Sequence, residues 1–426
     1  MRYQPKRVAV IGAGPAGLAA AAEAVKKGHV VLYDKNRDAG AKLLISGSGQ
    51  CNIASAGPLE ERLLHYPAHA RECIAHALKV HTVSNLLAWF EQRGICFEVR
   101  HEGTKSPLAS KNAERVRGKI FPAEGGAASI RDALMHEIVK GGGEFSGQDA
   151  VHKIERTDTG FKVYALKSQA AELYHAVIIS CGGMSWPQTG STGDGYRMAG
   201  ELGHTIIKPV PALTSVVCPD EEIAGLAGVA LRAVRVRVVR RGVQLEESRT
   251  GDVLFTHRGL SGPAILDASY LMRGGDSVSL ESLDPRDAQE CIARVMQLAE
   301  SAGSARMSRA LEMTGLPRAV QDTLAQRAGI DRADRLASTG KKRIAELGRL
   351  LVDLRFSVRG VVGMEQAMCT AGGVSLDEID CMTMQSKKVP GLFFCGEVLD
   401  LNGDCGGYNI HAALASGWLA GKSVFL

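Results

Sequence analysis

The feature that most constrains the fold lies in residues 7–34, where an apolar strand, a glycine-rich turn, a helix and a second strand follow in order. The turn reads Gly-Ala-Gly-Pro-Ala-Gly. In such a unit Gly12 permits the tight turn, Gly14 lets a pyrophosphate approach the backbone, and Gly17 lets helix and strand pack closely. Asp34 ends the second strand and can accept hydrogen bonds from a ribose. The order of these parts predicts an α/β dinucleotide-binding domain, with phosphates at the helix N-terminus.

The composition sets wider bounds. A length of 426 residues predicts two or three domains. The net charge of +5 is small for this length and disfavours nucleic acid as a partner, although residues 105–119 are basic. No apolar run is long enough to cross a bilayer, so we expect no membrane association. The ten cysteines show no metal-binding spacing. We therefore expect no metal and a reducing, cytoplasmic setting.

Changes of pattern along the chain predict one nucleotide-binding domain interrupted by an insertion. Residues 213–282 alternate and are rich in β-branched side chains, whereas residues 286–350 have helical spacing. Short strands return after residue 356, and residues 100–120 are polar and predict a surface loop. The predicted parts are a first nucleotide-binding part at 1–207, a β part at 208–284, a helical part at 285–352, and a second nucleotide-binding part at 353–426.

Four further segments are rich in glycine and small polar residues. They cover residues 42–52, 181–196, 255–264 and 396–409. Repeated glycines let backbone N–H groups face a planar or anionic ligand at short range. A mononucleotide needs only the first turn, so several such loops indicate a long ligand such as flavin adenine dinucleotide (FAD).

Together with the first glycine turn, the segments at residues 46–52, 190–196, 255–264 and 391–417 resemble the BaiN/YhiN-like, or aminoacetone-oxidase-like, NAD(P)/FAD-dependent flavoproteins over essentially the whole chain. The resemblance implies a Rossmann-like FAD-binding domain built from both chain ends, with an inserted β-barrel-like domain and an inserted helical domain. It also implies an FAD-dependent oxidoreductase that transfers a hydride between the flavin and a small organic substrate. Because no second complete glycine fingerprint is present, NAD(P)H is expected only as a transient electron donor over the flavin.

The same resemblance assigns the cofactor contacts. Gly12, Gly14 and Gly17 would hold the pyrophosphate, and Asp34 the adenosine ribose. Asp194 would lie near the cofactor, as in similar segments of fumarate-reductase-like flavoproteins. The other assigned positions are Ala16, Lys35, Lys42, Gly47, Cys51, Asn52, Val151, Gly182, Gly183, Gly396, Glu397, Asp400, Gly407, Tyr408 and Asn409. The last three would approach the flavin ring at the start of a final helix, whose dipole would stabilise negative charge on the reduced ring.

Two positions depart from the family pattern. Gln50 stands where a basic residue usually precedes Cys-Asn, and Lys119 stands where an arginine is usual. Specificity for an anionic substrate can differ if either position binds it.

Two catalytic candidates remain open. His257 is a candidate proton donor or a hydrogen-bonded structural histidine. Cys51 is a candidate redox group or a small loop residue. Two other functions are also open, namely a flavin-dependent nucleic-acid-modifying enzyme and a non-catalytic flavin-binding sensor.

Overall fold

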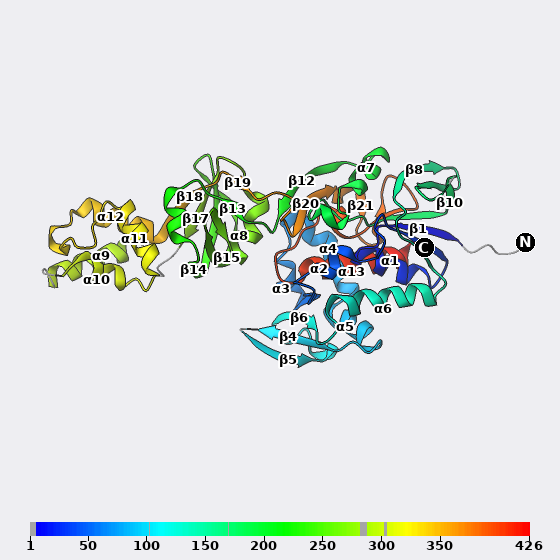
Figure 1. The fold of residues 1–426 in the computed structure, drawn as a ribbon, viewed down its shortest axis with the longest axis horizontal. Coiled ribbons are helices and arrows are strands. Elements are labelled where there is room, and N and C mark those ends of the chain that lie inside the picture. Colours follow the sequence, from blue (N-terminus) through cyan, green and yellow to red (C-terminus); the bar gives the residue numbers. More distant parts are fainter. Residues whose placement is uncertain (1–5, 102, 169, 282–287, 302–304) are drawn as a thin grey trace, which may run out of the picture. The chain divides into compact units, whose positions relative to one another are not determined.

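The structure is a computed structural model that describes residues 6–101, 103–168, 170–281, 288–301 and 305–426 (Figure 1). The chain forms two compact units. Unit 1 comprises Met1–Val210 and Met364–Leu426, and unit 2 comprises Pro211–Gly363. Among the described residues, no helix combines the length and apolar character needed to cross a membrane.

Unit 1 is built on a seven-stranded sheet to which both chain ends contribute. Its order is β21-β22-β23-β11-β1-β2-β7. The C-terminal strand β23 lies parallel to β11, with Ile178 opposite Phe393, and β11 lies parallel to β1. The strands are β1 (Arg7–Ile11), β2 (His29–Tyr33), β7 (Glu144–Ser146), β11 (Ala176–Ile179), β21 (Ile379–Asp380), β22 (Gln385–Ser386) and β23 (Leu392–Phe394). Continuous burial along β1 and β11 is typical of a parallel sheet covered on both faces. The Rossmann-like α/β architecture is therefore confirmed.

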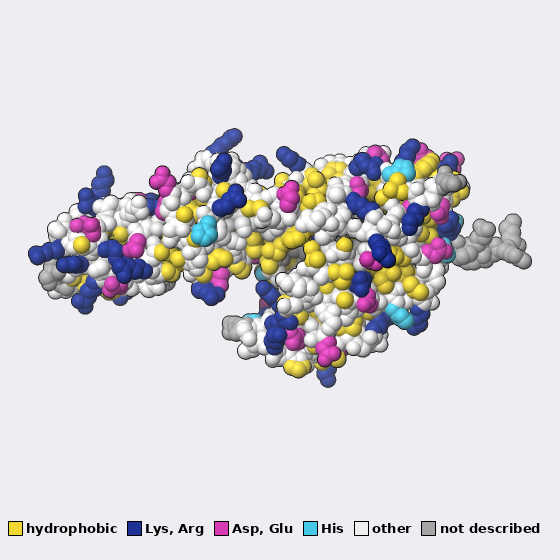
Figure 2. Space-filling model, viewed as in Figure 1, with side chains coloured by type: hydrophobic (Ala, Val, Ile, Leu, Met, Phe, Trp, Pro, Cys, Tyr) yellow, Lys and Arg dark blue, Asp and Glu magenta, His cyan; other side chains and the backbone are white. Residues whose placement is uncertain are grey.

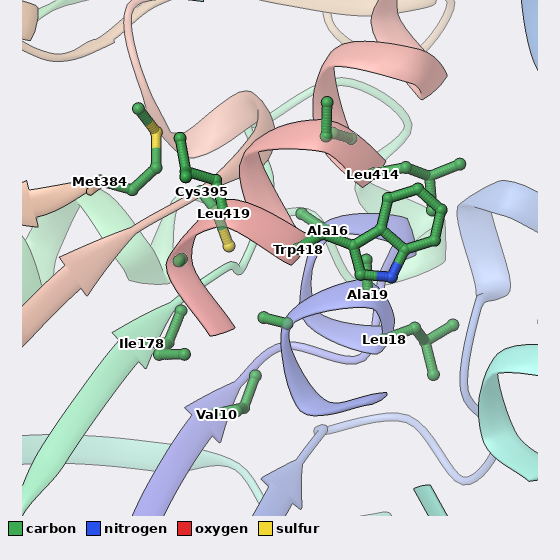
Figure 3. Packing of buried hydrophobic residues seen from close by; sticks show 14 of the residues in the cluster. Val10, Ala16, Leu18, Ala19, Ile178, Met384, Cys395, Leu414, Trp418 and Leu419 are labelled. Carbon is green, nitrogen blue, oxygen red and sulfur yellow. The ribbon is translucent and has the colours of Figure 1, made fainter. Parts of the chain in front are cut away.

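Two helices, α1 (Pro15–Ala24) and α13 (Tyr408–Ser423), pack closely through small residues (Figure 3). A side chain at Gly417 would collide with the carbonyl oxygen of Ala16, and one at Gly421 with that of Ala20. The two contacts are four residues apart on both helices, so the helices run parallel. Because α13 begins nine residues before Gly417, its N-terminus extends about 12 Å beyond that of α1.

The rest of unit 1 surrounds this framework. A four-stranded sheet has the order β3 (Ala54–Ala56), β6 (Gly118–Pro122), β4 (Phe97–His101) and β5 (Thr104–Leu108). A three-stranded sheet has the order β10 (Glu172–Tyr174), β9 (Gly160–Ala165) and β8 (Val151–Thr157). In a third sheet, β12 (Ile206–Ala212) pairs with β20 (Cys369–Val374). Its other helices are α2 (Ala41–Ile45), α3 (Leu59–Leu63), α4 (Ala68–Val80), α5 (Val83–Glu91), α6 (Gly126–Lys140) and α7 (Asp194–Glu201).

Two expectations from the sequence were wrong. Residues 100–120 are not simply a surface loop, because β4, β5 and β6 pair there in one antiparallel sheet. Four of the five residues of β5 are exposed, so this edge strand lacks the apolar alternation that marks a strand in sequence. The thiols were also expected to be reduced, but Cys73 and Cys381 form a disulfide. The fold brings their Cα atoms within 4.9 Å across 308 positions of sequence.

Unit 2 contains a second seven-stranded sheet, with the order β18-β17-β14-β15-β16-β13-β19. Its strands are β13 (Val216–Val217), β14 (Ala230–Arg240), β15 (Val243–Thr256), β16 (Gly259–Ser261), β17 (Ser277–Glu281), β18 (Asp353–Ser357) and β19 (Gly360–Val361). Only two residues separate the edge strands β18 and β19 in the chain, so the sheet must curl until its edges approach each other. This curvature agrees with the expected barrel-like form.

The helices of unit 2 are α8 (Pro263–Ala268), α9 (Ala288–Ser301), α10 (Met307–Glu312), α11 (Arg318–Arg327) and α12 (Lys341–Val352). Their buried side chains share one hydrophobic core with the sheet, in which Val236, Phe255 and Leu347 are almost completely buried. The predicted boundary between the β part and the helical part, at 284–285, lies outside the described residues, as do residues 302–304.

Candidate functional site

The glycine turn after β1 contains two glycines required by packing and one that faces open space. A side chain at Gly12 would lie 2.7 Å from the Ser180 oxygen, and one at Gly17 would collide with the Gly12 oxygen. By contrast, apart from the neighbours of Gly14 in the chain, no atom of the described residues lies within 4 Å of the position that a Cβ at Gly14 would occupy. Gly14 is the N-cap of α1, which has neither a side-chain cap nor an acidic residue in its first turn. The unpaired N–H groups at this helix end suit a phosphate.

Asp34 is fixed beneath this turn. Its Oδ2 accepts a hydrogen bond from the Ala13 N–H at 2.7 Å, and its Oδ1 accepts one from the Asn36 N–H at 2.8 Å. Burial raises the pKa of this carboxyl above its ordinary value, while the two N–H donors oppose the shift. Since each carboxylate oxygen has two lone pairs, the side chain can still accept from a ribose hydroxyl.

The structure brings together two predicted residues that are 159 positions apart. The Lys35 ammonium lies 2.5 Å from Asp194 Oδ2 and also donates to Thr192. Burial favours the neutral form of Asp194, but its bonds to Lys35 and Thr192 outweigh burial and hold its pKa below the ordinary value. The pair therefore links the end of β2 to the start of α7, so Lys35 is held away from other anions.

A polar cluster surrounds Glu397. Its Oε1 accepts from the Thr370 N–H at 3.0 Å, the Ser185 hydroxyl at 3.1 Å and the Lys42 ammonium at 3.4 Å. A side chain at Gly183 would collide with the Thr370 hydroxyl and approach Glu397 Oε1 to 2.6 Å. Lys42, Gly183 and Glu397 were predicted to lie along the cofactor. Ser185 and Thr370 were missed, because nothing in the local sequence links them to Glu397.

The N-terminus of α13 provides a second open helix end. Its N-cap, Gly407, has a φ of 96°, and a side chain there would lie 2.8 Å from Asn52 Oδ1. This Asn52 oxygen is buried and has no hydrogen-bond partner within the described part of the chain. A buried acceptor without a partner is costly, so it points to a donor on a bound ligand. An N–H group of a flavin ring beside the start of α13 would satisfy it.

The loop that carries Asn52 also holds Cys51, which is fully buried and has a positive φ of 59°. Burial raises the pKa of its thiol to about 12, although a hydrogen bond with Ser46 opposes the shift. The thiol is thus protonated near neutral pH, which favours the structural interpretation of Cys51 over the redox one. Gly47, in the same loop, is exposed.

The last predicted cofactor contacts, Asp400, Tyr408 and Asn409, lie at the start of α13 or shortly before it. Asn409 uses both ends of its amide on Gly403, accepting from its N–H at 2.7 Å and donating to its carbonyl at 2.8 Å. Its side chain therefore closes the loop that precedes α13, and only its backbone can face a ligand. The Tyr408 ring stacks on His65 with 4.3 Å between the ring centroids. Asp400 accepts from the Gly372 N–H at 3.0 Å.

The remaining predicted positions differ in their surroundings. Ala16 is buried, and a side chain added at Gly396 would lie 2.6 Å from the Cβ of Ala16. Val151 is buried at the start of β8. Gly182 follows β11 with a φ of 71°. His257 is exposed in the turn between β15 and β16. It is the one predicted site residue in unit 2, since all the others belong to unit 1. Within the described ranges, no group of His, Cys, Asp and Glu could hold a metal ion.

A row of cations lies beside the Asn52 loop. Arg100 on β4 is directly opposite Lys105 on β5 and Lys119 on β6, so the three side chains share one face of the small sheet. We call them the cationic row; Figure 2 shows Lys and Arg side chains over this end of the molecule. Arg100 donates to the Gln50 side chain and lies 3.9 Å from the centroid of the Phe121 ring. Sequence reasoning noted Gln50 and Lys119 but missed that Arg100 joins them.

These features fit FAD. Two uncapped helix ends, offset by about 12 Å along parallel axes, face the same way, one suited to a pyrophosphate and the other to an electron-rich ring. Asp34 lies near the first helix end and would contact the ribose, and the unpartnered Asn52 oxygen lies near the second and would contact the ring. We therefore propose that the cofactor binds in unit 1, along the line from Asp34 to Gly407.

The chain matches the family model described as HI0933-like protein Rossmann domain over residues 6–423. It is 30% identical to the ribosomal RNA dihydrouridine synthase of Escherichia coli (strain K12), over 97% of each chain. It is 29% identical to the protein of the same name from Haemophilus influenzae, again over 97% of each. It is 26% identical to the 3-dehydro-bile acid delta(4,6)-reductase of Clostridium scindens, over 98% of each.

Among solved structures, 3-ketosteroid-delta4-(5alpha)-dehydrogenase from Rhodococcus jostii RHA1 shares the fold with a TM-score of 0.53. That alignment covers 100% of this chain and 98% of the other at 16% identity, so it bears on the fold alone. The chain belongs to the HI0933-like Rossmann family, and the resemblance predicted from sequence is confirmed. It is an FAD-dependent oxidoreductase, which removes the non-catalytic sensor as an alternative.

Proposed function

We propose that this member of the HI0933-like family reduces the C5=C6 double bond of uridine in ribosomal RNA to give dihydrouridine. The observation that carries the proposal is the cationic row beside the Asn52 loop. Two relatives of about 30% identity bear the matching name and align over nearly their whole length, which supports it. The proposal revises the expectation, drawn from net charge, that nucleic acid is disfavoured as a partner.

The geometry of the cationic row suits a polyanion. Adjacent strands lie about 4.8 Å apart, so the row from Lys119 to Lys105 extends over about 10 Å. One carboxylate on a small substrate cannot contact all three cations, whereas successive phosphates can. Glu98 lies 2.6 Å from Arg100 and 3.8 Å from Lys105, so the row keeps a net positive charge. The row lies next to the proposed flavin site, because Arg100 contacts Gln50, which is two residues before Asn52 in the chain.

The chemistry follows from the cofactor. Bound FAD supplies hydride transfer, and we propose NAD(P)H as its transient donor. Reduction of uridine adds one hydride and one proton across C5=C6, whose electrons are conjugated with a ring carbonyl. The protein must therefore bind the RNA backbone, hold the base beside the ring end of the site, and provide a proton donor.

The test uses purified, FAD-loaded protein, NADH or NADPH, and unmodified ribosomal RNA under anaerobic conditions. We expect nucleoside mass spectrometry to detect dihydrouridine. The variant Lys105→Ala/Lys119→Ala should bind RNA more weakly, with a salt dependence smaller by about one unit of slope for each lost phosphate contact. Lys162→Ala, an exposed lysine on β9, is the matched control. RNA binding that is equal in all three proteins, or no dihydrouridine with either donor, would contradict the proposal.

A second candidate is reduction of an activated double bond in a small, largely apolar molecule. It is supported by the relative named as a bile acid reductase. Both candidates reduce a double bond conjugated with a carbonyl, so they share the chemistry and differ in the substrate. Adding a steroid enone in place of RNA in the same assay distinguishes them, because only the small-molecule enzyme would reoxidise its flavin with the steroid.

A further inference from the structure

We propose that His65 donates the proton that completes reduction of the double bond, and that Asp404 positions its ring. The inference rests on the proposed reduction of a conjugated double bond, in RNA or in a small molecule. Neither residue was a candidate in the sequence, where 339 positions separate them. The fold places both at the N-terminus of α13, the end we assign to the flavin ring.

The geometry is that of an oriented histidine. His65 Nδ1 lies 3.0 Å from Asp404 Oδ2, and the Asp404 N–H donates back to the His65 carbonyl oxygen at 2.9 Å. The Asp404 side chain is only 9% exposed, whereas that of His65 is 43% exposed. The His65 ring also stacks on the Tyr408 ring, with 19° between the two planes, and this contact fixes the plane of the imidazole. Backbone, carboxylate and ring thus hold the imidazole in one orientation.

This orientation gives the two ring nitrogens different tasks. A carboxylate accepts from Nδ1–H, which leaves Nε2 at the accessible edge of the ring. A carboxylate paired with a histidine in this way holds the ring in one tautomer and one orientation. The donor is then Nε2–H, and solvent can restore its proton after each turnover because the side chain is partly exposed.

The step balances in atoms and electrons. Bound, reduced FAD would supply the hydride for a new C–H bond at one carbon, and the π electron pair would move to the other carbon and its conjugated carbonyl. That carbon would take a proton from Nε2–H of His65, which would leave the imidazole neutral and the flavin oxidised. A fixed proton donor of this kind contributes about 10²–10⁴-fold.

The chain contains its own control for a merely structural role. Four residues further along the chain, His69 Nε2 lies 3.2 Å from Asp400 Oδ2 and so makes a similar pair between the same two segments. If these pairs only hold the segments together, removal of either should have a similar effect. If His65 is the acid, only its removal should slow protonation.

The experiment separates the two half-reactions in stopped flow. Wild type, His65→Gln, Asp404→Asn and His69→Gln are first reduced anaerobically with NADPH and then mixed with ribosomal RNA or, separately, with cyclohexenone. For His65→Gln we expect flavin reduction at the wild-type rate, reoxidation slower by at least about 10²-fold, and a larger solvent deuterium isotope effect. Asp404→Asn should show a smaller loss with the same rise in isotope effect, and His69→Gln should match wild type.

The outcomes keep the two proposals apart. Wild type that is reoxidised by cyclohexenone but not by RNA would overturn the RNA substrate and still test His65. Reoxidation of His65→Gln within a few fold of wild type, at normal FAD content, would overturn the assignment. Equal losses in His65→Gln and His69→Gln, with lowered melting temperatures and an unchanged isotope effect, would also overturn it and leave both pairs structural.

Discussion

The two units use different means to build a framework. In unit 1 the helices α1 and α13 approach each other through glycine and alanine, and several glycines lie where a side chain would collide with backbone. In unit 2 the sheet and helices enclose a core of larger aliphatic and aromatic side chains. Unit 1 also has a core of large side chains, so it differs from unit 2 in the glycines that line its helix ends and loops.

This contrast shows where the chemistry is placed. All predicted cofactor contacts, the unpartnered Asn52 oxygen and the His65–Asp404 pair belong to unit 1. Eleven of the twelve histidines and all three tryptophans are also in unit 1. His257 is the histidine of unit 2. The comparison predicts that changes in unit 1 affect cofactor and catalysis, and that matched changes in unit 2 do not.

The largest expected difference in FAD content is between valine substitutions at two glycines, Gly14 in unit 1 and Gly340 in unit 2, that have similar local surroundings. Gly14 and Gly340 are both helix N-caps with ordinary φ values, −73° and −62°, and neither has an atom within 4 Å of an added Cβ. Valine should therefore leave both apo folds intact. In Gly14→Val the side chain would occupy the space proposed for the pyrophosphate, so we expect FAD to be lost on purification.

Gly340→Val in unit 2 should keep its full FAD content, measured by flavin absorbance per folded chain. Because the valine side chain would occupy the space of the pyrophosphate itself, we expect a loss above about 3 kcal/mol for Gly14→Val, which is a rise in the FAD Kd of more than about 150-fold. If both variants keep FAD, the pyrophosphate lies elsewhere. If both lose it, the effect is on folding and the contrast between the units fails.

The second expected effect is acid sensitivity of unit 1. Burial, aided by Arg62, lowers the pKa of His411 to about 3, and burial with Lys422 nearby lowers that of His81 to about 4. Unfolded histidine has a pKa of about 6.5. The unfolded state therefore binds protons first, so the stabilisation is complete above about pH 6.5 and is lost as the pH falls towards 3–4.

Tryptophan fluorescence reports unit 1 selectively, because Trp89, Trp186 and Trp418 all belong to it. Urea unfolding between pH 7 and pH 5 should show a free energy that decreases by up to about 1.4 kcal/mol per pH unit for each of the two histidines. His411→Gln should lower the stability at pH 7 but flatten this slope. An unchanged slope in the variant would show that His411 is not neutral in the fold.

Local sequence predicted the parts of unit 1 that depend on backbone conformation. The turn at Gly12–Gly17 and the acid at Asp34 stand at fixed spacings, because a nucleotide imposes its dimensions on one continuous segment. Contacts between distant segments left no such signal. The Glu397–Ser185–Thr370 cluster, the Cys73–Cys381 disulfide and the His65–Asp404 pair each join residues that only the tertiary fold brings together.

The cationic row shows a different reason for failure. Four of the five residues of β5 are exposed and the row itself consists of Lys and Arg side chains, so the segment read as a basic loop. The charges were visible in the sequence, but their alignment was not, because it depends on the register Arg100–Lys105 and Arg100–Lys119. Net charge alone therefore says nothing of this local alignment, on which the proposed RNA partner rests.

A smaller effect should come from Asp34→Ala in unit 1. The carboxylate has two N–H donors of its own in the fold, so its removal loses one hydrogen bond to the ribose and loosens the turn at Ala13. We expect FAD binding to weaken by about 1–3 kcal/mol, the range for a hydrogen bond to a charged group. Titration calorimetry with the apoprotein measures this change, and Asn at this position should restore part of it. An unchanged Kd would place the ribose elsewhere.

The smallest expected effect is that of His257→Ala, which tests the contrast from the side of unit 2. His257 was a catalytic candidate from sequence, and in the structure it is exposed in a turn. If His65 is the proton donor, loss of His257 should slow flavin reoxidation far less than loss of His65, and FAD content should not change. A fall in reoxidation of at least about 10²-fold, with normal FAD content and melting temperature, would instead identify His257 as the acid. Such a result would overturn the expectation that changes in unit 2 leave catalysis unaffected.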